Sequence, residues 1–340
     1  MIIILNRDVT DTQIDEVRAF LEARGLGIHL SRGVETTILG AIGALDDQKA
    51  ELEGQLAALT YVDRVVPISK PYKVVARQFR PQGTTIRVRD VEIGGSRICV
   101  MAGPCTIESE EMMIATATHV REAGAHILRG GAFKPSTSPY SFHGMGEDGL
   151  KLLAAARDAT GMPIITEVMD PRDVELVCGY ADILQVGTRN MTNFTLLREI
   201  GAARTPVMLK RGWASTIEEW LQAAEYIASR GNYDIILCER GIRTFETYTR
   251  NTFDINAIPA LKSLSHLPII ADPAHGTGRW DLVTPVACGA VAAGADGVMV
   301  EVHPTPALAL KDGAQSLTFA NFTALMERLR AIVHAVGRDC

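Results

Sequence analysis

Eight short apolar runs, separated by amphipathic stretches, repeat along the chain from residue 98 almost to its end. The runs lie at residues 98–102, 126–128, 164–167, 183–186, 207–209, 235–238, 269–271 and 297–300. The stretches between them, such as 110–123, 217–228 and 319–336, have the amphipathic pattern of helices. Eight strand–helix units over about 240 residues predict a parallel (β/α)8 TIM barrel spanning residues 98–340. An open doubly wound sheet is the alternative, but the G-x-G-x-x-G sequence typical of that fold is missing after the first run.

A separate unit precedes the barrel at residues 1–70. Its pattern predicts strands at 2–5, 28–30, 36–39 and 64–68, one helix capped by Thr10 or Asp11, and a second helix over 46–59. This β-α-β-β-α-β order predicts a small ferredoxin-like domain. The unit has no convincing cluster of catalytic side chains, so small-molecule binding and a purely structural or dimerising role both remain open.

Residues 71–97 are expected to connect the two domains. Prolines at 67, 71 and 81 and several basic residues predict a linker over the first part of this segment. Residues 85–88 and 91–98 flank Arg89 and Asp90, and we expect them to form a β-hairpin in front of the barrel.

The charge and cysteine patterns argue against several classes of protein. The net charge of -6 is spread along 340 residues, whereas nucleic-acid binding needs a clustered basic face. No stretch approaches the roughly 20 apolar residues of a membrane span. The apolar N-terminal run is too short for a signal peptide and has no basic region before it. Six cysteines without CxxC spacing favour reduced thiols in a cytoplasmic protein.

The loop that follows the second run, at residues 128–140, has the sequence LRGGAFKPSTSPY. It places Arg129 and Lys134 around Gly130 and Gly131, which can adopt positive φ angles and let a ligand approach the backbone closely. Prolines at 135 and 139 stiffen the rest of the loop. A rigid loop with two cations directly after a strand is suited to binding a small polyanion, although a surface turn with two solvated charges is the simpler interpretation of this stretch alone.

Functional residues of a (β/α)8 barrel gather at the C-terminal ends of its strands. Five cations follow the predicted strands: Arg129, Lys134, Arg189, Lys210 and Arg240. Any one of them could form an ordinary salt bridge on a barrel loop. Five cations at one opening would repel one another, so together they predict a substrate with two anionic groups, or two anionic substrates.

A second set at the same end consists of Cys105, His275, Glu301 and Asp312. A thiolate, an imidazole and two carboxylates are ligand types for a divalent metal, with Cys and His favouring Zn, Fe or Co and the carboxylates admitting Mn. Cys105 as a nucleophile with His275 as its base is the alternative, but that arrangement leaves Glu301 and Asp312 without a role.

Eight motifs in order resemble those of one enzyme family, the type I β 3-deoxy-D-arabino-heptulosonate 7-phosphate (DAHP) synthases, which have a ferredoxin-like regulatory domain before the barrel. They are AGPCTIES (102–109), LRGGAFKPSTSPYSFHGMG (128–146), ITEVMD (165–170), QVGTRNM (185–191), LKRG (209–212), ILCERGIRTFE (236–246), DPAHGTGR (272–279) and VEVHPTPALALKDG (300–313). The resemblance implies condensation of phosphoenolpyruvate with erythrose 4-phosphate, the first step of the shikimate pathway.

The resemblance also implies roles for individual residues. The catalytic residues would be Lys134, His275 and Cys105, and the ligands of one divalent metal (Mn, Fe, Co or Zn) would be Cys105, His275, Glu301 and Asp312. Phosphoenolpyruvate would bind Arg129, Lys134, Glu167, Arg189, Lys210 and Arg240, and erythrose 4-phosphate would bind Lys134, Pro135, Ser136, Thr137 and Asp312. Residues 1–70 would bind Tyr or Phe as a feedback inhibitor and close over the barrel opening, and the family suggests a homotetramer.

One departure from the family stands out. The usual KPRT is KPST here, so Ser136 replaces an arginine expected to contact the sugar phosphate. Our hypothesis is that Arg243, Arg279 or a cation from an adjacent subunit compensates.

Two alternative functions remain. One is 3-deoxy-D-manno-octulosonate 8-phosphate synthase, although that branch usually has a KANRSS-like loop and no N-terminal domain. The other is a non-catalytic, amino-acid-sensing barrel, which the four intact ligand positions disfavour.

Overall fold

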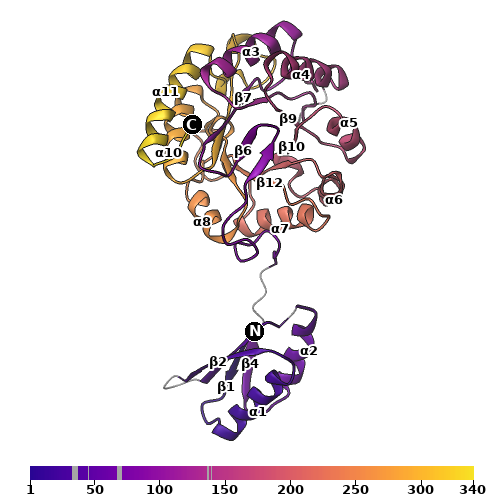
Figure 1. The fold of residues 1–340 in the computed structure, drawn as a ribbon, viewed down its shortest axis with the longest axis vertical. Coiled ribbons are helices and arrows are strands. Elements are labelled where there is room, and N and C mark those ends of the chain that lie inside the picture. The colour runs from indigo at the N-terminus through magenta and orange to yellow at the C-terminus, as the bar shows by residue number, and fades with distance from the viewer. Residues whose placement is uncertain (33–36, 45, 67–70, 136–137, 139) are drawn as a thin grey trace. The chain divides into compact units, whose positions relative to one another are not determined.

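The computed structural model describes the chain except residues 33–36, 45, 67–70, 136–137 and 139. The chain divides into two compact units, Met1–Pro71 and Tyr72–Cys340 (Figure 1). No helix in the described part of the chain has the length and apolar content needed to cross a membrane.

The N-terminal unit has the predicted ferredoxin-like fold. Its elements are β1 (Ile2–Leu5), α1 (Asp11–Glu22), β2 (Gly27–Arg32), β3 (Thr37–Ile42), α2 (Asp46–Ala57) and β4 (Val62–Val66). The strands form an antiparallel sheet in the order β2-β3-β1-β4. Helix α1 begins at a capping box, in which the Thr10 hydroxyl accepts from the backbone of Gln13 and the Gln13 side chain accepts from that of Thr10. Its apolar face then packs on the sheet.

The second unit is a closed barrel of eight parallel strands, which confirms the predicted (β/α)8 fold. The strands are β7 (Cys99–Gly103), β8 (Ile127–Arg129), β9 (Ile164–Glu167), β10 (Ile183–Val186), β11 (Val207–Lys210), β12 (Ile235–Glu239), β13 (Ile269–Ala271) and β14 (Gly297–Glu301). The helices are α3 (Glu110–Ala123), α4 (Glu147–Thr160), α5 (Val174–Cys178), α6 (Phe194–Ala203), α7 (Ile217–Ala228), α8 (Ala257–Leu264), α9 (Pro273–Thr277), α10 (Trp280–Ala292) and α11 (Phe319–Ala335). Figure 1 shows helices surrounding the strands.

Side chains alternate along each barrel strand between two apolar environments. In β9, for example, Ile164 belongs to the layer shared with the helices, whereas Ile165 belongs to a separate cluster inside the barrel. Residues from the other strands fill the same interior cluster, including Ile127, Ile183, Met208, Ile236, Ile270 and Met299. Apolar packing of the lower lumen leaves the C-terminal ends of the strands for polar groups.

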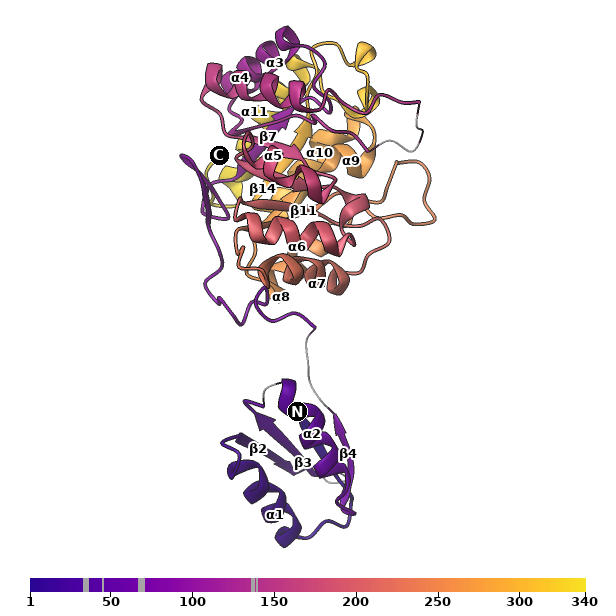
Figure 2. The same cartoon turned by 90° about the vertical axis from the view of Figure 1, so that its right-hand side faces the viewer.

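A hairpin closes the N-terminal end of this interior. Strands β5 (Ile86–Val88) and β6 (Val91–Ile93) pair as predicted, and Ile86, Val88 and Ile93 pack into the interior cluster. Figure 2 shows this segment at the opposite end of the barrel from the long loops that follow the strands.

The expectation of a linker is wrong from Tyr72 onward. Tyr72, Val75 and Ala76 are buried against the barrel. The backbone N–H groups of Val74 and Val75 donate to the Glu225 carboxylate, each at 3.0 Å. The apolar side chains gain burial and the backbone donors gain an ionised acceptor, so the segment is part of the barrel unit despite its prolines.

Candidate active site

A ring of polar side chains follows the apolar lumen at the C-terminal end of the barrel. Each member lies at the end of a strand or directly after it, two residues beyond an apolar residue that faces the lumen, as Arg129 lies beyond Ile127 and Glu167 beyond Ile165. The ring contains Arg129, Glu167, Gln185, Lys210, Arg240, Asp272 and Glu301. Above it lies a cavity of about 350 Å³, lined by Arg129, Lys134, Pro135, Ser138, Ser141, Glu167, Gln185, Gly187, Thr188, Arg189, Lys210, Trp213, Arg240, Arg250, His275, Lys311 and Asp312.

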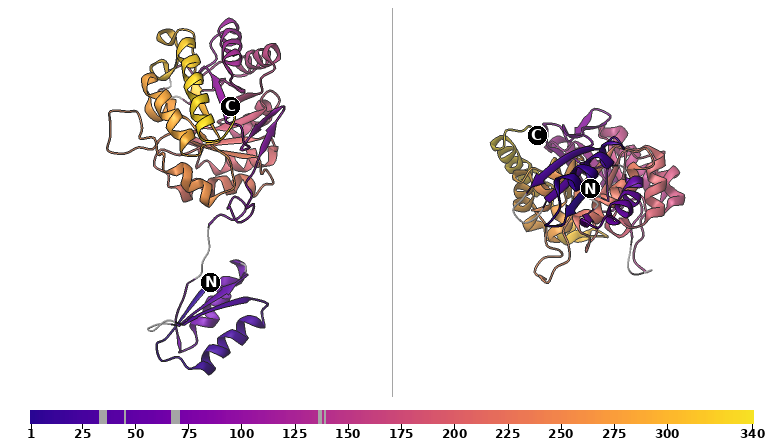
Figure 3. Two further views of the ribbon diagram at one scale, coloured as in Figure 1. Left: turned by 60° about the vertical axis from the view of Figure 1, so that its left-hand side comes forward. Right: turned by 90° about the horizontal axis from the view of Figure 1, so that it is seen from below.

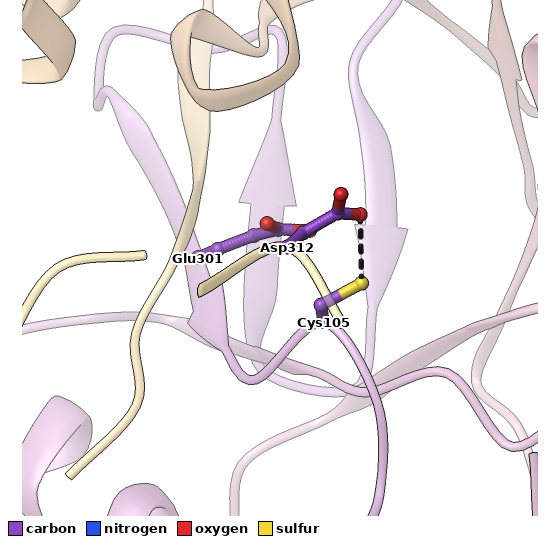
Figure 4. A group of neighbouring side chains, drawn as sticks. All are labelled: Cys105, Glu301 and Asp312. Atoms are coloured by element: carbon purple, nitrogen blue, oxygen red, sulfur yellow. Dashed lines mark hydrogen bonds between the residues drawn. The ribbon is translucent and has the colours of Figure 1, made fainter. Parts of the chain in front are cut away.

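Three of the four predicted metal ligands converge at one side of this ring. One possible ligand atom each from Cys105, Glu301 and Asp312 lies within 4.8 Å of the others. The Cys105 thiol donates to Asp312 Oδ2 at 3.2 Å, as the dashed line in Figure 4 shows. His275 lies beside this group, with Nε2 at 3.6 Å from Glu301 Oε1. The strand ends of β7, β13 and β14 and the loop after β14 therefore bring all four residue types together.

Buried partners hold these side chains in place. Arg129 Nη1 donates to Glu301 Oε1 at 2.8 Å, in a pair whose side chains are 4% and 1% exposed. Lys134 Nζ donates to the Cys105 carbonyl oxygen at 3.0 Å and lies 3.1 Å from the Cys105 sulfur. Asp272 Oδ2 lies 2.8 Å from His275 Nδ1. The site is therefore positioned by neighbouring charges, as sites that bind a cation usually are.

The pKa shifts in the group suit a divalent cation. Burial would raise the pKa of Asp312, but His275, Arg250 and the hydrogen bond from Cys105 lower it to about 2, so the carboxylate is ionised. Burial lowers the pKa of His275 despite the nearby Asp272, which favours the neutral imidazole that metals bind. Burial, reinforced by Glu301, raises the pKa of the Cys105 thiol to about 12. A bound metal ion would deprotonate that thiol.

Three further cations, Arg240, Lys210 and Arg189, line the cavity. Arg240 is 2% exposed, and its Nε finds no hydrogen-bond partner among the described residues. Burial lowers the pKa of Arg240, and its Nη1 donates only weakly to the Gly241 carbonyl oxygen, at 3.3 Å. Lys210 pairs with Asp272 at 2.5 Å, and the Arg189 guanidinium lies 4.9 Å from the centre of the Trp213 ring. A buried guanidinium whose Nε lacks a hydrogen-bond partner among the described residues is suited to an anionic ligand.

The two glycines of the 128–140 loop act differently from the prediction. Neither Gly130 nor Gly131 has a positive φ. A Cβ at residue 131 would instead lie 2.8 Å from the Cys105 carbonyl oxygen and 3.0 Å from Lys134 Nζ. Gly131 is therefore required for close contact between the Cys105 loop and the Lys134 side chain, rather than for its backbone angles.

Some charged residues near the strand ends lie outside the cavity. Arg211 Nη1 pairs with Glu239 and with Asp254, each at 2.8 Å. Arg243 stacks on Trp213, and Arg279 pairs with Asp281 at 3.0 Å, so neither proposed substitute for the missing arginine lines the cavity. The predicted ligands Ser136 and Thr137 lie outside the described residues.

Sequence reasoning missed several residues of the site. Gln185 could have been found, because it follows Ile183 by two residues and so faces the lumen. Trp213, Arg250 and Lys311 line the cavity from loops, and Gln315 contacts Glu301 from the segment after Asp312. No periodicity in the sequence marks these loop residues.

A closed (β/α)8 barrel with this thiol–imidazole–carboxylate group beside buried cations belongs to the class of barrel enzymes that act on anionic substrates. A profile of the DAHP synthetase I family matches residues 52–335, and one of the DAHP synthase ferredoxin-like domain matches residues 1–70. The chain belongs to the DAHP synthetase I family.

Individual relatives agree with this assignment. A phospho-2-dehydro-3-deoxyheptonate aldolase from Thermotoga maritima is 48% identical over 337 residues, which cover 99% of each chain. A crystal structure of DAHP synthase from the same organism has a TM-score of 0.82 and 47% identity, covering 99% of this chain and 98% of that one. A 2-dehydro-3-deoxyphosphooctonate aldolase from Syntrophotalea carbinolica is more distant, with 32% identity over 73% of this chain and 95% of its own length.

Proposed function

We propose that this protein is a metal-dependent DAHP synthase, which condenses phosphoenolpyruvate with erythrose 4-phosphate and releases phosphate. One observation carries the proposal: the Cys105–Glu301–Asp312 group lies beside a cavity lined by buried cations. The T. maritima relative, which shares the whole length of the chain, has a matching name.

Phosphoenolpyruvate fits the cationic side of the cavity. Its phosphate and carboxylate carry the charges that Arg129, Lys134, Arg189, Lys210 and Arg240 would neutralise. Arg240 and Arg129 have hydrogen-bonding capacity to offer, because the buried Nε of each is unpaired within the described chain. Glu167 lies among these cations, with Oε2 accepting from Gln185 at 3.4 Å. We assign Glu167 to orient the phosphate or a bound water.

Cys105, His275, Glu301 and Asp312 would hold one divalent metal ion, and this mixed ligand set accommodates Mn, Fe, Co or Zn. A metal ion there would act as a Lewis acid toward the aldehyde oxygen of erythrose 4-phosphate. Burial alone would lower the pKa of Lys134, but Cys105, Glu167 and Glu301 raise it, so its ammonium group is charged at neutral pH. Lys134 can therefore stabilise negative charge that develops on that oxygen.

The reaction has a simple atom balance. C3 of phosphoenolpyruvate attacks the aldehyde carbon, and the aldehyde oxygen takes up a proton. Water adds at C2, and the bond between C2 and the bridging oxygen breaks to release inorganic phosphate. The cations of the cavity hold both substrates together and offset the charge of the departing phosphate.

Erythrose 4-phosphate would bind at the outer part of the cavity, near Lys134, Pro135, Asp312 and the 136–137 segment. Arg243 and Arg279 do not line the cavity, whereas Lys311 does, so we assign Lys311 to replace the arginine that the family has at position 136. Lys311 lines the cavity next to Asp312 and is half-buried there. An ammonium group at that position would supply a charge-assisted contact to the sugar phosphate.

We further propose that the Met1–Pro71 unit binds Tyr or Phe as a feedback inhibitor and that the enzyme is a cytoplasmic homotetramer. The match of residues 1–70 to the family's ferredoxin-like domain supports the regulatory role.

The test is a phosphate-release assay on EDTA-treated protein with single metals added back. We expect release that requires a divalent metal, phosphoenolpyruvate and erythrose 4-phosphate together. Faster turnover with arabinose 5-phosphate would favour the octulosonate alternative. No release with either aldose phosphate would favour the amino-acid-sensing barrel.

A further inference from the structure

A side-chain amide connects the two carboxylates of the Cys105–Glu301–Asp312 group. Gln315 Nε2 donates to Glu301 Oε2 at 2.8 Å. Its Oε1 accepts from Arg250 Nη1 at 2.8 Å, and the same Arg250 nitrogen donates to Asp312 Oδ1 at 3.0 Å. The chain of contacts therefore runs from Glu301 through Gln315 and Arg250 to Asp312.

We propose that Gln315 is a positioning residue for the metal site, which fixes the Glu301 carboxylate directly and Asp312 through Arg250. This inference rests on the proposed metal-dependent function. It adds a residue outside the four ligands and explains why an amide occupies this position.

The two neighbours of Gln315 dictate its chemistry. A guanidinium group can only donate hydrogen bonds and a carboxylate can only accept them. The residue between Arg250 and Glu301 must therefore accept on one side and donate on the other. An amide of the length of Gln meets both needs, whereas Met at this position offers no N–H donor and Glu would place a second carboxylate against Glu301.

Both oxygens of Glu301 are held by different partners as a result. Oε1 accepts from Arg129, and Oε2 accepts from Gln315. Gln315 itself is 2% exposed and is fixed by its backbone, since its N–H donates to the Asp312 carbonyl oxygen at 3.2 Å. Leu317 N donates to the Glu301 carbonyl oxygen at 2.8 Å, so this segment runs directly beside the end of β14. Loss of the Gln315 amide would free one Glu301 oxygen to rotate.

Arg250, which contacts both Gln315 and Asp312, belongs to a different loop from these two residues. It lies at the base of the exposed loop after β12, which protrudes from the barrel in Figure 3 and includes Phe245 at 97% exposure. Arg250 N donates to the Thr277 carbonyl oxygen at 2.9 Å, close to His275. Gly278 has a φ of +69°, and a side chain there would collide with Arg250 Cβ. Arg250 is therefore anchored against the segment that carries the predicted histidine ligand.

The test measures metal affinity rather than turnover. Full-length metal-free protein is titrated with Co²⁺, following the ligand-field bands and the thiolate-to-cobalt absorption. For Gln315→Met we expect a Co²⁺ dissociation constant about 10- to 100-fold weaker than that of the wild type, with altered bands. Arg250→Met, at a side chain 41% exposed, removes a cation beside Asp312 as well as the contact to Gln315, so its own effect on Co²⁺ affinity combines two opposing parts. Gln315→Met should weaken binding by a smaller factor in the Arg250→Met background than in the wild type, because both side chains act in one chain of contacts.

Asn232→Leu is the matched control, because Asn232 is another buried amide and donates to the Thr205 carbonyl oxygen at 2.8 Å. It should lower thermal stability without changing Co²⁺ affinity. A dissociation constant of Gln315→Met within twofold of wild type, or an equal fold loss in the wild-type and Arg250→Met backgrounds, would overturn the inference while leaving the proposed function intact. If Gln315→Met does not fold, Gln315→Asn replaces it, because an amide one methylene shorter cannot reach both Arg250 and Glu301 and should show the same loss of Co²⁺ affinity. Wild-type protein that fails to bind Co²⁺ would refute the metal site and this inference together.

Discussion

The buried pair of Arg129 and Glu301 gives the most demanding test of the site. In metal-free protein, Arg129→Met would leave the Glu301 carboxylate, 1% exposed, without its cationic hydrogen-bond donor, while the neutral Gln315 amide would still donate to the other oxygen. Removing one member of a buried ion pair typically costs about 3–5 kcal/mol, because the remaining charge stays desolvated. We therefore expect the barrel's free energy of unfolding to fall by about 3–5 kcal/mol.

A bound metal should reduce that loss. A divalent ion would compensate Glu301 in the variant, whereas in the wild type it must share Glu301 with the Arg129 cation. Arg129→Met should therefore bind Co²⁺ at least about tenfold more tightly, and linkage then makes the loss at saturating metal smaller by about 1.4 kcal/mol or more. This is the opposite sign to the effect expected for Gln315→Met, because the amide is neutral and the guanidinium competes with the metal.

Urea unfolding followed by tryptophan fluorescence measures this directly. All three tryptophans, Trp213, Trp220 and Trp280, lie in the barrel unit, so the signal reports its unfolding alone. Arg87→Met is the control, since Arg87 pairs with Glu92 at 2.6 Å but both side chains are largely exposed. Its midpoint should not move detectably. A loss below about 1 kcal/mol in metal-free Arg129→Met, or an equal loss with and without metal, would refute the reasoning.

Three further predictions follow from other parts of the chain. Burial, reinforced by Arg97, lowers the pKa of His126 to about 4. The unfolded chain binds a proton at this imidazole more readily than the folded chain does. The pKa shift therefore stabilises the fold fully above pH 6.5, and this contribution of roughly 3 kcal/mol is lost as the pH falls toward 4. Urea unfolding at several pH values should show this dependence, and His126→Gln should remove it. Lys311→Ala should raise the erythrose 4-phosphate KM about tenfold or more without changing that for phosphoenolpyruvate, and Ser136→Arg should restore it; a large gain from Ser136→Arg in the wild type would show that nothing compensates. The Tyr72–Cys340 unit alone should release phosphate but resist Tyr and Phe, and inhibition of this truncated enzyme would contradict a regulatory N-terminal unit.

The barrel and its polar ring were predictable because both follow from local pattern. Strands buried on two faces read as continuous apolar runs, and their number and spacing define the closed barrel. Arg129, Glu167 and Lys210 each follow an apolar lumen residue by two positions, so strand geometry alone places them on one rim.

The remaining features depend on contacts between distant segments. Arg250 reaches Asp312 only because its loop bonds to Thr277, and no short-range pattern encodes that contact. The prediction of a linker from residue 72 onward was wrong for a similar reason. The carboxylate that accepts from the backbone of Val74 and Val75 belongs to Glu225 on α7, far away in the sequence. Gly131 was recognised as special but for the wrong cause, because its neighbours, rather than its φ, exclude a side chain.

The hairpin of Ile86–Val88 and Val91–Ile93 has a kinetic consequence. The hairpin closes the N-terminal end of the barrel interior, and the described cavity lies at the C-terminal end. Substrates and products therefore enter and leave the cavity from the C-terminal end. Arg240 is buried and Lys311 is half-buried, so a molecule bound at Arg240 would lie deeper in the cavity than one bound at Lys311. A cavity of this kind favours ordered binding and release, in which the deeper ligand binds first and the shallower ligand leaves first.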